Sequence, residues 1–238
     1  MTKLWGTHHE KVLEACERSL NKLNVEYIDL YLIHAPLSMR YVDEETLIPK
    51  TADGNMDVVE VDHSKIWVDM EKCVEKGWVK SIGVSNFNSQ QVKDIVDNCK
   101  IKPVCNQVEC SPIANQRKLA KFCKDIGVVV TGYSPFGQTI KPEEKKPSYL
   151  FDAKVHEIGK KYGKTAAQVI LRYSVELGVV PIAKSATKSR IIENSEIFDF
   201  SLTKDEIEYL DTFNDFKKRV VTMTNYENCK YYAFGIEF

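Results

Sequence analysis

The sequence predicts an α/β fold of the β/α-barrel type. Short apolar runs alternate with amphipathic helical patterns, which is typical of a parallel sheet covered by helices. Polar residues follow one strand after another, as they do at the active-site end of a barrel. None of the 11 glycines falls in a G-x-G-x-x-G or phosphate-loop pattern, which argues against the competing open, doubly wound sheet.

Six apolar runs are expected to form strands. Each is short and nearly continuous, so both of its faces are expected to be covered. The runs are residues 3–5, 27–34, 79–86, 104–109, 128–134 and 179–185.

Helical patterns separate these runs. The spacing from Thr7 to Glu10 matches a capping box and predicts the start of a helix that carries an apolar stripe through Leu23. Glycines are expected to end three further helices in a left-handed cap. The remaining patterns are Ile66 to Val74, ending at Gly77; Val92 to Val96, after Asn88 and Ser89; Leu119 to Cys123, ending at Gly127; Ala166 to Tyr173, ending at Gly178; and a helix that begins at Thr203.

Polar side chains are expected at the ends of five successive strands. Because the carboxyl ends of barrel strands meet on one face, these side chains form a candidate ring around an active site. The ring consists of His34, Ser85 and Asn86, Gln107, Tyr133 and Ser134, and Lys184 and Ser185.

Composition excludes several functions. Lys and Arg number 33 against 34 Asp and Glu, so the chain has no strong field for nucleic acid or a membrane surface. The apolar runs are too short to span a bilayer, and residues 1–7 have no signal-peptide core. Seven cysteines without a C-x-x-C pair predict reduced thiols, no metal site and a cytoplasmic location.

One domain is expected over residues 1–238, because no Pro/Gly/Ser-rich linker divides the chain. Residues 35–62 form a long connection without periodicity on the active face, which favours either a substrate-side role or a floppy insert. Residues 214–238 are rich in aromatic side chains without helical spacing and are interpreted as a tail over the barrel mouth.

Six motifs in order make the chain resemble the aldo-keto reductase superfamily, in the branch of aldose reductase and hydroxysteroid dehydrogenases. They are Thr-Lys-Leu-Trp at 2–5, Asp-Leu-Tyr-Leu-Ile-His at 29–34, Gly-Val-Ser-Asn-Phe at 83–87, Asn-Gln-Val-Glu-Cys at 106–110, Gly-Tyr-Ser-Pro-Phe-Gly at 132–137 and Ile-Ala-Lys-Ser-Ala-Thr-Lys-Ser-Arg at 182–190. The resemblance implies a (β/α)8 barrel that uses NADPH to reduce small-molecule aldehydes or ketones to alcohols.

The resemblance also implies roles for individual residues. Lys3 matches the lysine that lowers the pKa of a proton-donating tyrosine, and His34 matches the histidine that hydrogen-bonds the carbonyl oxygen. Trp5 and His34 are expected beside the substrate. The cofactor residues are Ser85, Asn86 and Gln107 for the carboxamide; Tyr133 for stacking; Ser134 and Phe136 along the pyrophosphate; Lys184, Ser185 and Arg190 for the 2′-phosphate; and Glu193 and Asn194 for adenine. Alone, Lys184, Ser185 and Arg190 would read as a basic helix start on the surface.

The chain departs from the family at its beginning. A closed barrel needs eight strands, so the first two βα units are expected to be missing, together with the catalytic tyrosine and its aspartate partner. The chain is interpreted as an N-terminally truncated fragment or short isoform of a reductase that is monomeric at full length. Two alternatives stay open: a non-catalytic NADPH-binding protein, and a structural or partner-binding barrel fragment.

Overall fold

The computed structural model describes residues 1–137, 142–144 and 147–236. They form two compact units: Met1–Asn106 with Met223–Phe238, called unit 1, and Gln107–Thr222, called unit 2. Residues 138–141 and 145–146 and the last two residues of the predicted tail lie outside the described residues. The single domain over residues 1–238 stays a prediction. Among the described residues, no helix has both the length and the apolar character to cross a membrane.

Unit 1 is built on strands β1 (Thr2–Leu4), β2 (Ile28–Ile33) and β5 (Val79–Ser85), followed by the start of β6 (Cys105–Glu109). The strands β1 and β5 both run parallel to β2, with Lys3 opposite Leu32 and Tyr31 opposite Ile82. Buried side chains such as Leu32, Ile33 and Val84 line the sheet. The predicted strands are therefore confirmed here: β1 is shifted by one residue, β2 is shorter by one residue at each end, and β5 is shorter by one residue at its end.

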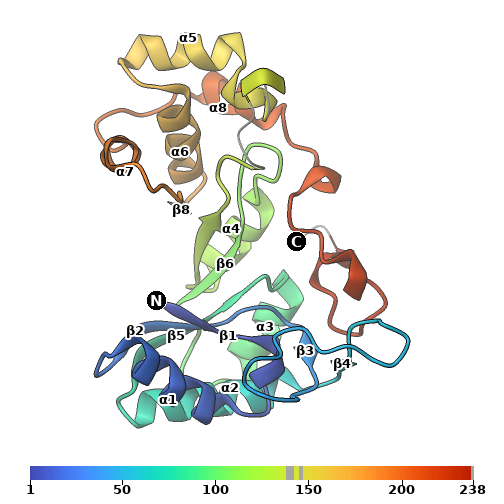
Figure 1. Cartoon of the computed structure of the whole chain (residues 1–238). Coiled ribbons are helices and arrows are strands. Elements are labelled where there is room, and N and C mark those ends of the chain that lie inside the picture. The colour runs from blue at the N-terminus through green and yellow to red at the C-terminus, as the bar shows by residue number, and fades with distance from the viewer. Residues whose placement is uncertain (138–141, 145–146, 237–238) are drawn as a thin grey trace. The chain divides into compact units, whose positions relative to one another are not determined.

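Helices α1 (Val12–Leu23) and α2 (His63–Glu75) lie side by side on one face of these strands, and α3 (Ser89–Asn98) follows β5 (Figure 1). The glycine predicted to end α2 is confirmed, because Gly77 has a φ of 73°. A capping box formed by Asn88 and Gln91 starts α3.

The predicted capping box at Thr7 is wrong. Thr7 lies in a 3-10 turn, Gly6–His8, and α1 has Lys11 at its N-cap without a side-chain cap bond. The Thr7 side chain is buried at 1% exposure, and its hydroxyl has no hydrogen-bond partner among the described residues. The residue thus fills the interior of unit 1, which spacing alone could not reveal.

The connection at residues 35–62 contains regular structure. Strands β3 (Ser38–Met39) and β4 (Val58–Val59) pair antiparallel within it, and a bridge joins Lys50 to Met56. Two-residue strands are too short to show an alternating pattern, so the sequence gives no signal for them.

Unit 2 continues the sheet in the order β6-β7-β8, with β7 (Val129–Tyr133) parallel to β8 (Val179–Ile182). Its helices are α4 (Arg117–Asp125), α5 (Ala153–Tyr162), α6 (Ala166–Glu176), α7 (Lys188–Ser195) and α8 (Lys204–Asp211). The helix predicted from Thr203 is confirmed with its capping box. Together with β1, β2 and β5, these strands form a six-stranded sheet whose strands alternate with helices. The fold is an incomplete (β/α)8 barrel.

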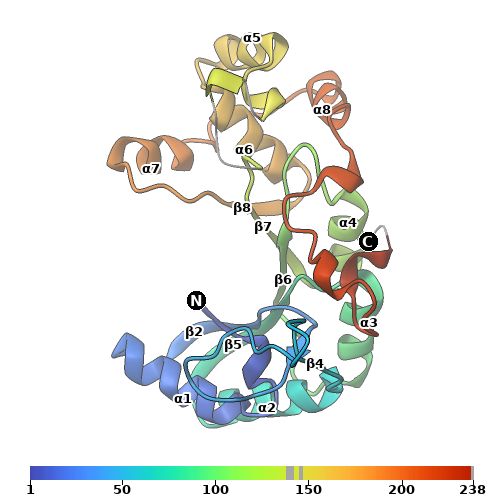
Figure 2. The same ribbon diagram turned by 45° about the vertical axis from the view of Figure 1, so that its right-hand side comes forward.

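The core of unit 2 is centred on α6, which packs against α5 and β8 (Figure 2). Val169, Ile170 and Tyr173 from α6 meet Tyr149 and Leu210, all buried. The structure adds α5 and α7 to the predicted helices. Only two side chains of α5, Val155 and Ile158, and none of α7 are buried, so neither helix carries a full apolar stripe that pattern analysis could detect.

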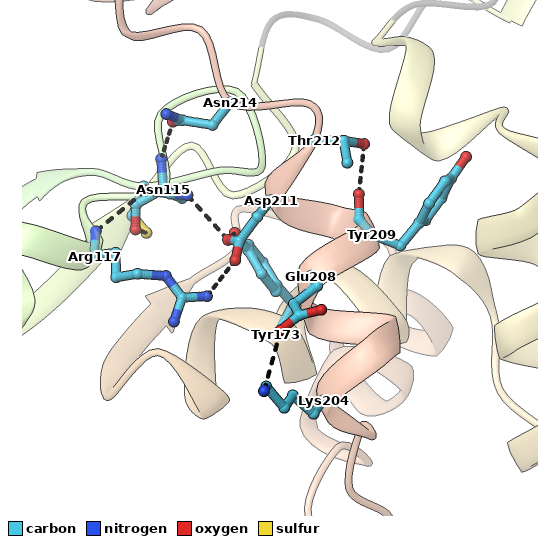
Figure 3. A network of polar contacts seen from close by, with 10 residues as sticks. Asn115, Arg117, Tyr173, Lys204, Glu208, Tyr209, Asp211, Thr212 and Asn214 are labelled. Atoms are coloured by element: carbon cyan, nitrogen blue, oxygen red, sulfur yellow. Dashed lines mark hydrogen bonds and ion pairs between the residues drawn. The ribbon is translucent and has the colours of Figure 1, made fainter.

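A carboxylate on α8 fastens this core to the turn before α4 (Figure 3). Asp211 accepts hydrogen bonds from Tyr173 at 2.6 Å and Asn115 at 3.1 Å, and it pairs with Arg117 at 2.5 Å. It therefore joins α8, α6 and the residues that follow β6.

We expect Asp211→Asn to lower the free energy of unfolding by about 1–2 kcal/mol, because an amide loses the ion pair and part of the acceptor capacity. Glu208→Gln is the matched control on α8, because the Glu208 side chain is 61% exposed and its ion pair with Lys204 is long, at 3.5 Å. Urea titration should show that the control lowers the free energy of unfolding by less than about 0.5 kcal/mol. Equal losses in both variants would contradict the role of the buried network.

Candidate active site

In unit 1, three of the predicted site residues form a hydrogen-bonded chain. The Lys3 ammonium donates to Ser85 Oγ at 3.2 Å. Asn86 Nδ2 donates to the same oxygen at 3.3 Å and to the backbone carbonyl of His34 at 2.9 Å. The adjacent ends of β1, β2 and β5 therefore bring Lys3, His34, Ser85 and Asn86 together, as the sequence predicts.

Local backbone contacts hold this group in place. Asn86 follows β5 with a φ of 63°, a left-handed conformation that asparagine tolerates better than most residues. One residue further on, the carbonyl of Phe87 accepts a hydrogen bond from Asn106 Nδ2 at 2.8 Å. The turn after β5 is thus fixed by buried amide side chains.

Burial sets the charge states of the two predicted catalytic residues. It lowers the pKa of Lys3 to about 8, partly opposed by the Cys105 thiol. It also lowers the pKa of His34 to about 4, and the charge of Lys3 adds to that effect. At neutral pH, Lys3 is therefore a cation and His34 a neutral imidazole, which can donate one ring hydrogen to a carbonyl oxygen.

The predicted substrate residues, Trp5 and His34, are neighbours. Their rings meet edge to face with centroids 4.7 Å apart. The indole nitrogen of Trp5 donates to the carbonyl of Leu47 at 2.6 Å, so the 35–62 segment contacts the substrate-side residues directly. This contact favours the first of the two roles expected for that segment.

In unit 2, Tyr133 ends β7 and Ser134 follows it with a φ of 51°. Burial raises the pKa of Tyr133, so its phenol is neutral. Phe136 packs against the core cluster of this unit. Gln107 is buried and lies two residues before the end of β6, which runs to Glu109 as predicted.

The residues predicted for the 2′-phosphate surround the start of α7. The strand β8 ends at Ile182, so Lys184 and Ser185 lie in the loop beyond it and not in the strand as predicted. Ser185 Oγ accepts from the backbone nitrogen of Thr187, the N-cap residue of α7, at 3.2 Å. Lys184 and Arg190 are exposed. Two cations beside a helix N-terminus suit an anionic group.

The residues predicted for adenine lie later on the same helix. Glu193 accepts a hydrogen bond from Thr165 Oγ1 at 2.6 Å through its carboxylate. Its backbone carbonyl accepts from Gln168 Nε2 at 3.0 Å, and both partners form the capping box of α6. Glu193 is therefore fixed by α6, while Asn194 is half-buried beside it.

Sequence reasoning gave no role to Glu109, although it lies in the Asn-Gln-Val-Glu-Cys motif. Its carboxylate is 1% exposed and accepts from the backbone nitrogens of Val220 and Val221, both at 2.7 Å. It thereby secures residues 220–221 against the end of β6. A charged residue at the end of a strand that is expected to be covered on both faces is the signal that could have identified it.

Comparisons with known proteins identify the family of this chain. The model of the Aldo/keto reductase family matches residues 2–215. The chain is 44% identical to aldo-keto reductase family 1 member A1-A of Danio rerio over 90% of the chain and 66% of that protein. It is 42% identical to member C1 of Macaca fuscata fuscata over 100% of the chain and 75% of that protein.

Solved structures give the same result. The aldose reductase of Schistosoma japonicum superposes with a TM-score of 0.86 at 37% identity, covering 100% of this chain and 75% of that one. The Bombyx mori aldo-keto reductase in complex with NADP also has a TM-score of 0.86, at 34% identity, covering 98% and 73%. The chain spans 66% to 75% of the length of these four proteins. The chain therefore belongs to the aldo/keto reductase family.

Proposed function

We propose that this chain carries the NADPH-binding and carbonyl-orienting residues of a reductase that converts aldehydes or ketones to alcohols. The connected group of Lys3, His34, Ser85 and Asn86 in unit 1 carries this proposal. The carboxamide of the nicotinamide is a primary amide and fits this group, because hydroxyl and amide side chains include both hydrogen-bond donors and acceptors. The exposed cations Lys184 and Arg190 of unit 2 support NADPH in preference to NADH.

Each residue has a separate task in this proposal. NADPH, when bound, supplies the hydride. Ser85, Asn86 and Gln107 would hold its carboxamide, and the ring of Tyr133 would support the nicotinamide. The neutral His34 would donate a hydrogen bond to the substrate carbonyl and so draw electron density from its carbon. Trp5 would form the apolar wall beside His34.

The second candidate is an NADPH-binding chain without turnover. It is favoured by the sequence of residues 1–238, in which none of the 11 tyrosines lies in the motif of the family's proton donor. Fluorescence titration with NADPH and turnover of a reactive aromatic aldehyde separate the candidates. Binding without turnover supports the second, whereas turnover abolished by His34→Ala supports the first. Absence of binding would contradict both and leave a structural role.

Arg190→Ala is expected to weaken NADPH binding about 10- to 100-fold, because a bidentate, charge-assisted contact to the 2′-phosphate is lost. NADH binding should stay within about twofold, since NADH lacks this phosphate. Lys188→Ala is the matched control, being an exposed cation on the same helix. A comparable loss in the control would show general charge attraction rather than a specific contact.

A further inference from the structure

Helix α7 carries residues that the proposed function assigns to the adenosine end of NADPH, yet it has no buried side chain of its own. Its two isoleucines, Ile191 and Ile192, are 53% and 51% exposed. With 8 residues it is also too short to be stable alone, since isolated helices of fewer than about 12 residues are marginal in water. Contacts from a neighbouring element must therefore hold it in place.

Those contacts come from α6, which lies beside α7 in unit 2 (Figure 1). Gln168 on α6 is buried, and its Nε2 donates to the backbone carbonyls of Glu193 at 3.0 Å and Glu196 at 3.1 Å. Four residues earlier in the chain, Lys164 Nζ also donates to the Glu196 carbonyl, at 3.0 Å. Thr165 Oγ1 donates to the Glu193 carboxylate at 2.6 Å. Polar side chains at the start of α6 therefore tie down the C-terminal end of α7.

The Gln168 side chain caps two helices at once. Its Oε1 accepts from the backbone nitrogen of Thr165 at 3.0 Å, which is half of the capping box at the start of α6. Its Nε2 faces the end of α7, where the last four carbonyls of a helix lack α-helical partners. A glutamate could complete the same capping box but could not donate to α7. The bonds to α7 therefore require the amide of glutamine.

We propose that Gln168 is a positioning residue for the adenosine end of NADPH, although no contact with the cofactor is assigned to it. By fixing the last turn of α7 against α6, it keeps the helix that carries Arg190 and Asn194 in one position before the cofactor binds. A preorganised site binds more tightly, because less conformational entropy is lost on binding. This inference rests on the proposed function, because it assumes that α7 meets NADPH.

Gln168→Glu separates the two caps, since it keeps the acceptor for α6 and removes both donors to α7. Titrations with NADPH and with 2′,5′-ADP, which lacks the nicotinamide, should both show binding weakened about five- to tenfold. In an Arg190→Ala background the same change should weaken binding by less than about threefold, because the contact that depends on the position of α7 is already absent. Hydrogen exchange at the amides of residues 191–196 should be faster in Gln168→Glu.

Two further variants exclude other causes of the weaker binding. Gln168→Met adds no charge, so an equally large effect on affinity would exclude repulsion between a new carboxylate and the phosphate. Thr203→Ala is the matched control for stability, because it breaks the capping box of α8 and leaves the contacts of α7 intact. It should change NADPH affinity by less than about twofold. If either Gln168 variant failed to fold, Lys164→Met would replace it, with an expected loss of affinity of about two- to threefold.

Three results would overturn the inference: unchanged NADPH affinity in a folded Gln168→Glu or Lys164→Met variant, an effect of Gln168→Glu that is equal with and without Arg190, and an equal loss of affinity in Thr203→Ala. If the wild-type chain bound neither NADPH nor 2′,5′-ADP, the proposed function would fail and this inference with it. Binding of both ligands by the wild type together with any of the three results would reject the role of Gln168 alone.

Discussion

Gly83→Ala is expected to lower the free energy of unfolding by about 3 kcal/mol, close to the upper end for overpacked interiors. A Cβ at this position would lie 2.7 Å from the carbonyl oxygen of Cys105 and 2.9 Å from Cδ2 of Leu32. The oxygen belongs to the backbone of β6 and cannot rotate away. The glycine of the Gly-Val-Ser-Asn-Phe motif is thus required by the close approach of β5 and β6, and not by its conformation.

Gly235→Ala is the matched control, because a Cβ there would be 3.8 Å from the nearest side-chain atom, on Tyr232. Urea denaturation followed by circular dichroism should give this control a free energy of unfolding within about 0.5 kcal/mol of the wild-type value. The Gly83 variant should also bind NADPH more weakly, since Ser85 lies two residues further along β5. If Gly83→Ala lowered the free energy of unfolding by less than about 1 kcal/mol, β6 would be able to shift away from the new Cβ at low energetic cost.

The strands and most helices could be predicted because their signals are local and repeated. Nearly continuous apolar runs such as Ile28–Ile33 are read directly from the sequence. Gly77, Gly127 and Gly178 have φ values from 73° to 78°, which few other residues adopt readily. In each case the residues that determine the element lie within it.

The candidate site could be predicted for a related reason. In unit 1, His34 and Asn86 lie directly after the parallel strands β2 and β5, and parallel strands place such residues at one end of a sheet. The position of a residue directly after a parallel strand in the sequence therefore predicts where it lies in the fold. Which residues then touch, as Lys3 touches Ser85, does not follow from that rule.

The features that sequence reasoning missed depend on distant partners. Thr7 has the spacing of a helix cap but is buried, and Lys11 precedes the helix instead. The pairing of β3 with β4 joins residues about 20 positions apart in a segment without periodicity. Buried carboxylates such as Glu109 are hydrogen-bonded to residues 111 and 112 positions away. No local pattern encodes such contacts.

Glu71→Gln is expected to lower the free energy of unfolding by about 2–3 kcal/mol. The Glu71 carboxylate on α2 is 3% exposed, and its Oε1 accepts from the backbone nitrogens of Lys100 at 2.7 Å and Ile101 at 2.9 Å. A neutral amide oxygen accepts weaker hydrogen bonds than a carboxylate does. The new NH2 group also brings further donors to a buried site that already holds the backbone N–H groups of Lys100 and Ile101. The turn after α3 would lose most of its tie to α2.

Glu75→Gln is the matched control, because Glu75 lies one turn further along α2 and is exposed. It should change the unfolding free energy by less than about 0.5 kcal/mol. Hydrogen exchange gives a local test: the amides of Lys100 and Ile101 should exchange faster in the Glu71 variant alone. The bond from Trp67 Nε1 to the Ile101 carbonyl, at 3.0 Å, remains in both variants. Unchanged exchange at both amides would show that this indole, and not the carboxylate, holds the turn.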